Sequence, residues 1–219
     1  MEFTINKYKG HEKMFDVIVV GGGAAGLMAA GVAAQNGKST LLIEKMQKTG
    51  RKILVPGKGR CNVTNNCDRD TVLKNVISNP KFLYSALDLF SPEDTMAFFE
   101  DMGVPLKTER GNRVFPVSDR AMDIADALLK YCKQNGVKII NDTVKDLLTE
   151  NGSVCGVKTA SQDKILAPSV IIATGGVSYS KTGSSGDGYK FAKAVGHSIT
   201  PIRPSLVGLK AAGNDFKKM

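Results

Sequence analysis

The hydrophobic and polar positions of the first fifty residues predict a strand, a helix and a second strand. Val17 to Val20 is a continuous apolar run of the length of a buried strand, and an alanine-rich stretch after it ends at Asn36-Gly37, which is typical of a helix C-terminus. A second apolar run then closes on Glu44. Two strands with one helix between them form a βαβ unit.

The turn between the first strand and the helix carries glycines at the spacing Gly21-x-Gly23-x-x-Gly26. Such glycines allow a tight turn, a close approach of backbone to a pyrophosphate, and a close contact between helix and strand. The free N–H groups of the helix N-terminus can bind the phosphates, and Glu44 is placed to accept hydrogen bonds from a ribose. We therefore expect a dinucleotide site. The alternative, a glycine-rich turn that binds nothing, does not explain the acid.

The middle of the chain predicts two further helices and a β-hairpin. Ser91-Pro92 supplies an N-cap and a first-turn proline for a helix that ends at Gly103, and Ser118 opens a helix that ends at Gly136. Asn151-Gly152 is a typical hairpin turn between apolar segments. A last short helix is expected within residues 186–199.

Another apolar strand, in residues 168–176, points to the identity of the dinucleotide. It reads PSVIIATGG, and its small residues Thr174, Gly175 and Gly176 would let the chain pass close to a cofactor laid across a sheet. An N-terminal βαβ unit combined with such a segment resembles the FAD-binding domain of glutathione-reductase-like flavoproteins. That resemblance implies FAD and an α/β fold of three layers with a small β-meander, in which the strand around Val144 passes the adenine.

Residues 50–65, GRKILVPGKGRCNVTN, carry four cations, three glycines and two asparagines, and this composition argues against a helix or strand. The glycines would let backbone approach a cofactor, and Arg51, Lys52 and Arg60 could neutralise its phosphates. A cation near the pyrimidine edge of a flavin would also favour the reduced anionic ring. An exposed basic loop without a ligand is the alternative.

Four segments together resemble the BaiN/RdsA-type, aminoacetone-oxidase-like, NAD(P)/FAD-dependent flavoproteins, from Phe15 to about Lys210. They are DVIVVGGGAAGLMAA, GRKILVPGKGRCNVTN, RVFPVSDRA and ATGGVSYSKTGSSGDGYKFAKAVGHSITPIRPSLVGL. The resemblance implies an FAD site lined by Gly21, Gly23, Ala24, Ala25, Gly26, Glu44, Lys45, Arg51, Lys52, Gly59, Arg60, Cys61, Asn62, Val144, Thr174, Gly175 and Gly176.

The same resemblance suggests the domain organisation. Proteins of the family are roughly twice as long as this chain of 219 residues. We expect a flexible N-terminal extension at 1–13, an FAD-binding domain at 14–200, and at 201–219 the start of a second, substrate-binding domain that is otherwise missing. The expected function is two-electron oxidation or reduction of a small molecule with NAD(P)H or oxygen as partner. A catalytically inactive nucleotide-binding fragment is the alternative.

Composition and charge limit the other functions. The net charge of +9 is scattered apart from the basic segment and the chain ends, and it comes with no nucleic-acid-binding motif, so no nucleic-acid partner is expected. The apolar runs are far shorter than the ~20 residues of a membrane span. Four cysteines without two-residue spacing and two histidines argue against a zinc site. A reduced, cytoplasmic protein is the default.

No residue is assigned as a catalytic acid or base. Cys61 and Cys67 suggest a flavin-linked dithiol, but five residues separate them and the surrounding pattern of disulfide reductases is absent. Asp187 is interpreted as an acid at a helix N-terminus, and His197 as a structural residue.

Overall fold

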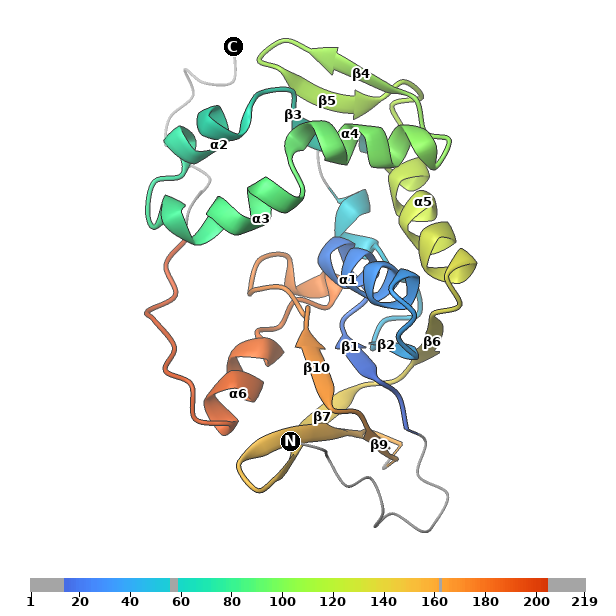
Figure 1. The fold of residues 1–219 in the computed structure, drawn as a ribbon, viewed down its shortest axis with the longest axis vertical. Coiled ribbons are helices and arrows are strands. Elements are labelled where there is room, and N and C mark those ends of the chain that lie inside the picture. Colours follow the sequence, from blue (N-terminus) through green and yellow to red (C-terminus); the bar gives the residue numbers. More distant parts are fainter. Residues whose placement is uncertain (1–13, 56–58, 162, 205–219) are drawn as a thin grey trace, which may run out of the picture.

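The computed structural model describes residues 14–55, 59–161 and 163–204. The expected extension at 1–13 and most of the segment 201–219 lie outside the described residues. Figure 1 shows the helices and strands of these residues, labelled in chain order.

The core is a four-stranded parallel sheet with the strand order β10-β1-β2-β6. The predicted βαβ unit is confirmed, because helix α1, Ala24–Gln35, connects β1 to β2. The strands of this sheet are β1 (Val17–Val20), β2 (Thr40–Glu44), β6 (Lys138–Asn141) and β10 (Ser169–Ile172).

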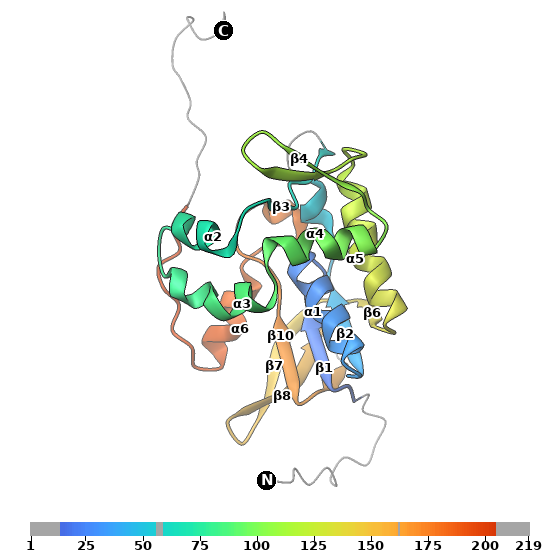
Figure 2. The ribbon, with the colours of Figure 1, turned by 45° about the horizontal axis from the view of Figure 1, so that its top comes forward.

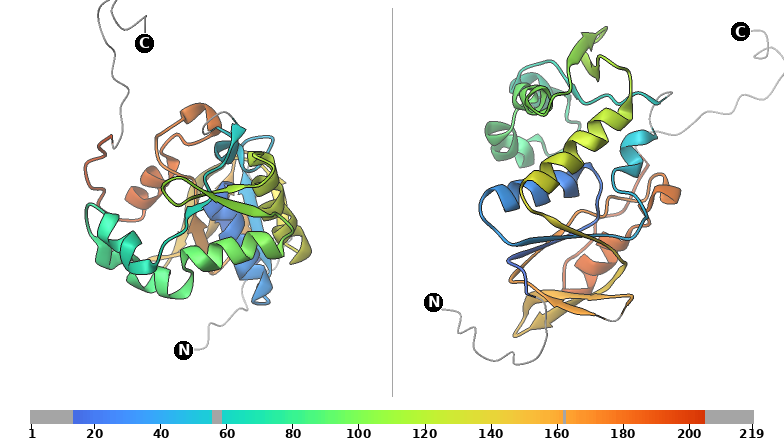
Figure 3. Two further views of the ribbon diagram at one scale, coloured as in Figure 1. Left: turned by 90° about the horizontal axis from the view of Figure 1, so that it is seen from above. Right: turned by 90° about the vertical axis from the view of Figure 1, so that its right-hand side faces the viewer.

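Alternate residues of β1 point to opposite faces of the sheet, and both faces are covered. Val17 and Val19 pack in one hydrophobic cluster with α1 and with helix α5, Ala121–Gln134. Ile18 and Val20 pack in a second cluster with the antiparallel strands on the other side. A strand that is buried on both faces explains the unbroken apolar run. Figure 3 shows the resulting layers of helices, parallel sheet and antiparallel strands.

The layer opposite the helices is the predicted β-meander. Asn151 and Gly152 both have positive φ, 49° and 78°, as a two-residue hairpin turn of type I′ requires. Its three antiparallel strands are β7 (Val144–Glu150), β8 (Ser153–Thr159) and β9 (Lys164–Leu166). The three-layer α/β fold with a small meander is therefore confirmed.

A second group of elements lies above the parallel sheet in Figures 1 and 2. A small antiparallel sheet in the order β3-β5-β4 belongs to this group. The predicted capping of α4 at Ser91 is confirmed, because Ser91 and Asp94 form a reciprocal capping box. The group comprises α2 (Arg69–Asn75), α3 (Tyr84–Leu89), α4 (Pro92–Asp101), β3 (Thr64–Asn65), β4 (Leu106–Glu109) and β5 (Arg113–Pro116).

Two local predictions are wrong. Segment 50–65 contains regular structure, because Gly50 turns the chain with φ 71° into a 3₁₀ helix at Arg51–Leu54, and β3 pairs with β5. Helix α5 begins after Arg120, because Ser118 donates its hydroxyl to Asp123 instead of capping the helix.

The short helix expected after residue 186 is α6, Asp187–Ala194. Within the described ranges, no helix is both long enough and apolar enough to span a bilayer. The same ranges hold no cluster of three His, Cys, Asp or Glu suited to a metal ion.

Candidate functional site

A pocket of about 780 Å³ lies at the carboxyl ends of β1, β2 and β10. The chain continues from β1 to β2 on one side, whereas β10 pairs with β1 on the other side. This is a topological switch point, where open α/β sheets bind their ligands in the crevice between strand ends. The glycine turn and α1 form the floor of the crevice.

Gly21 and Gly26 allow close packing in the glycine turn. A Cβ on Gly21, which has φ 105°, would lie 2.6 Å from the carbonyl oxygen of Ala173. A Cβ on Gly26 would lie 1.8 Å from the carbonyl oxygen of Gly21, so only glycine lets α1 approach the turn. At Gly23, in contrast, a Cβ would meet no atom within 4 Å, and Gly23, Ala24 and Ala25 line the pocket. The turn therefore leaves backbone open to a ligand.

Glu44, at the end of β2, is held in place by two backbone donors. Its Oε2 accepts from the Gly22 N–H at 2.6 Å, and its Oε1 accepts from the Met46 N–H at 2.7 Å. A carboxylate has about four acceptor sites, so two hydrogen bonds leave it able to accept from ligand hydroxyls. The carboxylate lines the pocket. These two bonds hold the carboxylate in a fixed orientation at the pocket.

The end of β10 brings Thr174 and Gly175 to the opposite wall. Gly175 has φ 72°, and a Cβ there would lie 2.8 Å from the Ser184 hydroxyl oxygen. The Thr174 hydroxyl oxygen is buried without a hydrogen-bond partner among the described residues. The start of α6 covers this oxygen, since a Cβ on Gly188 would lie 2.6 Å from it.

Cations of the 3₁₀ helix and of the turn before it line the same pocket. Lys48, Arg51 and Lys52 line it, and none of the three makes an ion pair in the described part of the chain. The position of a Cβ on Gly175 would lie 3.7 Å from the Lys52 Nζ. Unpaired cations in a crevice are available to phosphate oxygens.

Lys45 also lines the pocket, but its charge is paired. Its Nζ lies 2.6 Å from a carboxylate oxygen of Asp187, the first residue of α6, and 2.6 Å from the Ser185 hydroxyl oxygen. Burial alone would raise the pKa of Asp187, but the hydrogen bonds from Lys45 and Ser185 outweigh it and hold the pKa below its usual value. Asp187 is therefore an ionised pocket residue as well as a helix N-terminal acid.

Several lining residues escaped the sequence prediction. Some of them are neighbours of predicted residues in β1, β2, β10, the glycine turn and the basic segment, and Lys48 follows β2. A pair from the β6–β7 connection adjoins Val144, and the remaining residues belong to the segment 182–192, inside the long motif that carries the family resemblance. The missed residues are Val20, Gly22, Ile43, Lys48, Gly50, Ile53, Asp142, Thr143, Ile172, Ala173, Thr182, Gly183, Ser184, Asp187, Gly188, Tyr189, Phe191 and Ala192.

The structure leaves some predicted site residues outside the pocket lining. Gly26 packs inside the turn, and Gly176 follows the β10 wall. The others belong to the second half of the basic segment: Gly59, Arg60, Cys61 and Asn62. The pocket therefore does not bring these six residues together with the other predicted site residues.

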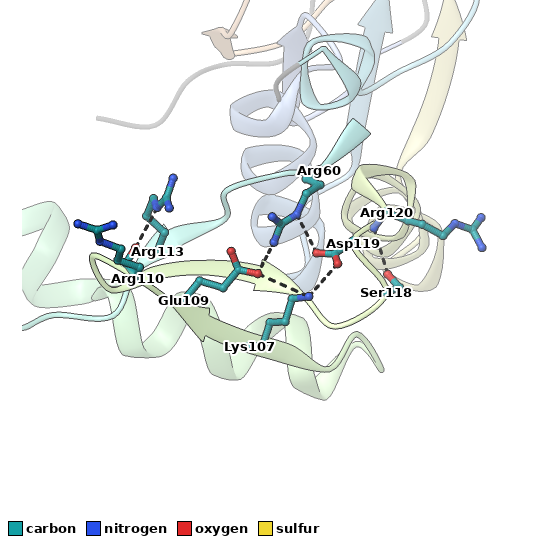
Figure 4. Close-up of polar contacts among 8 residues, drawn as sticks. All are labelled: Arg60, Lys107, Glu109, Arg110, Arg113, Ser118, Asp119 and Arg120. Atoms are coloured by element: carbon teal, nitrogen blue, oxygen red, sulfur yellow. Dashed lines mark hydrogen bonds and ion pairs between the residues drawn. The ribbon is translucent and has the colours of Figure 1, made fainter. Parts of the chain in front are cut away.

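Arg60 has different partners from those expected. Its guanidinium pairs with Glu109 and lies 2.8 Å from an Asp119 carboxylate oxygen, over the ring of Phe115 at 4.1 Å. Lys107 joins the same carboxylates, at 2.8 Å from Asp119 and 3.6 Å from Glu109. Figure 4 shows these side chains converging from β4, from the turn before α5 and from the basic segment. Arg60 therefore ties the basic segment to the small sheet.

Cys61 is 9% exposed and packs in the hydrophobic cluster beneath α1 and α5. Burial raises the pKa of its thiol, which opposes formation of the thiolate. Cys61 and Cys67 are both free thiols in the structure. These features disfavour the alternative of a catalytic dithiol.

The residues present fit a dinucleotide. A glycine cradle at a helix N-terminus, an oriented acid and unpaired cations line one pocket, and they match the pyrophosphate and a ribose of FAD.

Comparison with known proteins agrees with this geometry. Residues 15–219 match the family model of the HI0933-like protein Rossmann domain. The 3-dehydro-bile acid delta(4,6)-reductase of Clostridium scindens is 32% identical over 202 residues, which cover 91% of this chain and 48% of the relative. The ribosomal RNA dihydrouridine synthase of Escherichia coli is 33% identical, with 88% of this chain and 47% of the relative covered.

A solved structure shares the fold. The open conformation of a flavocytochrome c3 fumarate reductase superposes with a TM-score of 0.60 at 23% identity, covering 85% of this chain and 41% of that one. The chain spans about half the length of the curated relatives it matches. The predicted family resemblance is confirmed: the chain belongs to the HI0933-like Rossmann-domain family of flavin oxidoreductases, and its fold is that of their FAD-binding domain.

Proposed function

We propose that this chain binds FAD at the switch-point pocket, as part of an oxidoreductase that adds two electrons and two protons across a carbon–carbon double bond. The observation that carries the cofactor assignment is the joint presence of an open glycine turn, an oriented Glu44 and unpaired cations in one crevice. Bound flavin would supply the hydride chemistry. The protein then contributes binding, orientation and electrostatics.

The reaction class is inferred from the relatives. Dihydrouridine is uridine reduced at a ring double bond that is conjugated to a carbonyl. The name of the delta(4,6)-reductase likewise refers to reduction of a substrate with double bonds at positions 4 and 6. Both reactions add hydrogen to an unsaturated carbon pair. The corresponding proposal for this chain is reduction of a conjugated double bond in a small molecule, with NAD(P)H as the source of the two electrons.

The residues of this chain have distinct parts in that proposal. Glu44 would accept from the ribose hydroxyls, and the backbone of the glycine turn with the N-terminus of α1 would bind the pyrophosphate. Arg51 and Lys52 would neutralise phosphate charge. A cation close to the flavin would also stabilise negative charge that develops on reduction.

FAD binding is tested by equilibrium dialysis of the purified chain against FAD, with absorbance bands displaced from those of free FAD as the second readout. Glu44→Ala should weaken binding about tenfold or more, because a charge-assisted hydrogen bond to the ribose is lost. Glu100→Ala, on the exposed side of α4, is the control. Binding of NADPH without binding of FAD would refute the cofactor assignment, and unchanged affinity in Glu44→Ala would refute the ribose role.

The reaction class needs a turnover experiment. The reduced flavoprotein is mixed without oxygen with an α,β-unsaturated ketone, and with the same ketone already saturated as the control. Reoxidation of the flavin by the unsaturated compound alone supports the proposal. Reoxidation by a uridine-containing RNA but not by the ketone would replace the small-molecule substrate with nucleic acid, and no reoxidation by either would favour a nucleotide-binding fragment without activity.

A further inference from the structure

The start of α6 contacts the ends of both strands that flank β1. At the β10 side, a Cβ on Gly188 would lie 2.6 Å from the Thr174 hydroxyl oxygen. At the β2 side, Asp187 pairs with Lys45, the residue that directly follows β2. Because β1 lies between β10 and β2, the first turn of α6 bridges the crevice in which the glycine turn begins.

The β2 contact is tightly built. Gly183 has φ 104°, and a Cβ there would lie 3.0 Å from the Met46 Cγ and 3.4 Å from the Lys45 Cε. The Ser185 hydroxyl accepts from Lys45 and donates to Asp187 at 2.9 Å, so both members of the ion pair share a third partner. Gly186, with φ 83°, turns the chain into α6. The segment 183–187 is thus fitted against the exit of β2.

The ion pair itself lies at the pocket. Lys45 and Asp187 both line it, and each side chain is only 26% exposed. A second short ion pair, Arg69 with Asp88 at 2.7 Å, joins α2 to α3, and neither of its residues lines the pocket. The two pairs have similar lengths, but the Arg69–Asp88 pair is more exposed, at 39% and 53%, and lies away from the pocket.

We propose that the Lys45–Asp187 ion pair, supported by Ser185, is a latch across the nucleotide crevice that retains bound FAD. This inference rests on the proposed FAD binding and adds a role to it: the pair acts by holding α6 against the exit of β2 and does not itself bind the phosphates. Both residues are positioning residues. Opening the latch would let α6 move away from the crevice and let the dinucleotide leave.

The test is a double-mutant cycle on the rate of FAD release. Lys45→Met, Asp187→Asn and the double variant are loaded with FAD, and release is followed by the rise of flavin fluorescence after dilution. The latch predicts a rate about tenfold faster in each single variant, and no faster in the double variant than in either single one, because both changes break the same contact. Arg69→Met and Asp88→Asn are the matched controls and should release FAD as the parent does.

Three results would overturn the latch. Faster release in Lys45→Met with unchanged or slower release in Asp187→Asn would mean that Lys45 contacts the phosphates directly. Additive effects in the double variant would mean two independent roles. A lower unfolding temperature of the apoprotein with an unchanged release rate would mean a purely structural pair.

A second set of variants covers the case in which a single variant does not fold. Lys45→Arg and Asp187→Glu keep the charges and should keep slow release, whereas Ser185→Ala should speed it less than loss of either charge. Fast release in the charge-conserving variants, with the fold intact, would also contradict the latch. If the parent chain binds no FAD, the proposed function fails and the latch with it. If the parent binds and the cycle is additive, only the latch fails.

Discussion

The two halves of one basic segment have opposite surroundings. Arg51 and Lys52, in the 3₁₀ helix, line the pocket and make no ion pair among the described residues. Arg60, only a few residues further, pairs with Glu109 and Asp119 and lies outside the lining. The cations of both halves are at least partly exposed to solvent, so burial alone does not distinguish them. Their partners do.

The contrast shows which cations are available to a ligand. A cation already paired with two carboxylates contributes little net attraction to a phosphate, because its field is largely compensated nearby. An unpaired cation in a crevice keeps its full charge for the ligand. The pocket-lining half is therefore the half expected to bind the cofactor, and the other half anchors the segment to the small sheet.

The largest effect should come from the glycine turn between β1 and α1. Gly26→Ala would place a methyl group 1.8 Å from the Gly21 carbonyl oxygen, so α1 must move away from the turn. We expect a loss of about 3 kcal/mol in the free energy of unfolding, together with loss of FAD binding. Urea unfolding of the apoprotein measures the first effect, and dialysis against FAD measures the second.

Gly23→Ala is the matched control for that substitution. A Cβ at Gly23 meets no atom within 4 Å, and its φ of −79° suits any residue. Its stability should change by less than about 0.5 kcal/mol, while FAD affinity falls because the methyl group occupies the approach to the pyrophosphate. Equal destabilisation by the two substitutions would show that the turn is not packed as described.

The next effect tests the two halves directly. Lys52→Ala should raise the dissociation constant of FAD about tenfold by removing a charge-assisted phosphate contact, and Arg51→Ala should act in the same direction. Arg60→Ala should leave that constant unchanged and lower the unfolding temperature. The measurement is dialysis at low and moderate salt, because direct contact persists where long-range attraction is screened over about 8 to 10 Å.

Lys74→Ala provides a charge-matched control, since Lys74 lies in the last turn of α2, away from the pocket. If Lys74→Ala weakens FAD binding as much as Lys52→Ala does, net charge rather than contact explains the effect. If Arg60→Ala weakens it most, the division of the segment into two halves is wrong.

Local patterns were sufficient for the core of the fold. The βαβ unit, the Glu44 position and the hairpin turn each depend on residues within one short stretch, so their periodicity and turn chemistry are legible in the sequence. The same holds for the capping box at Ser91. The prediction that Ser118 caps α5 is wrong because a hydroxyl before a helix can form a hydrogen bond with a side chain as well as with the backbone.

The partners of the cations could not be predicted in this way. Arg60 meets carboxylates from β4 and from the turn before α5, and Lys45 meets Asp187 more than a hundred residues along the chain. Contacts between residues so far apart in the sequence leave no periodic pattern that would predict them. The cation content of segment 50–65 is plain in the sequence, but the sign of a charge does not reveal whether an acid elsewhere neutralises it.

A smaller effect is the pH dependence of the Arg60 cluster. The hydrogen bond from Arg60 lowers the pKa of Glu109, and the hydrogen bond from Lys107, with the nearby charge of Arg60, lowers that of Asp119. When the pH is above the ordinary pKa values of Glu109 and Asp119, near 4.5 and 3.8, these ionised carboxylates stabilise the fold. That stabilisation is lost as the pH falls through their lowered pKa values.

The unfolding temperature of the parent should therefore fall more steeply below about pH 4.5 than that of Arg60→Ala, which lacks the main partner of Glu109. Thermal unfolding between pH 3 and pH 7, followed by circular dichroism, makes the comparison. Parallel curves for the two proteins would mean that the cluster adds no pH-dependent stability.

The smallest expected effect concerns Cys67, which lies just beyond the end of the basic segment that contains Arg60. A flavin-linked dithiol needs a thiolate close to the flavin, but Cys61 is buried in the hydrophobic core, its pKa is raised by that burial, and neither cysteine lines the pocket. Cys67→Ser should therefore leave FAD affinity, flavin reduction by NAD(P)H and the unfolding temperature unchanged. Cys61→Ser should lower only the unfolding temperature, because a hydroxyl would replace a packed thiol in the core. Anaerobic titration of the loaded protein with reductant decides the matter: uptake of two electrons per flavin agrees with this expectation, and uptake of four in the parent but two in Cys67→Ser would establish the dithiol and make this half of the segment part of the redox site.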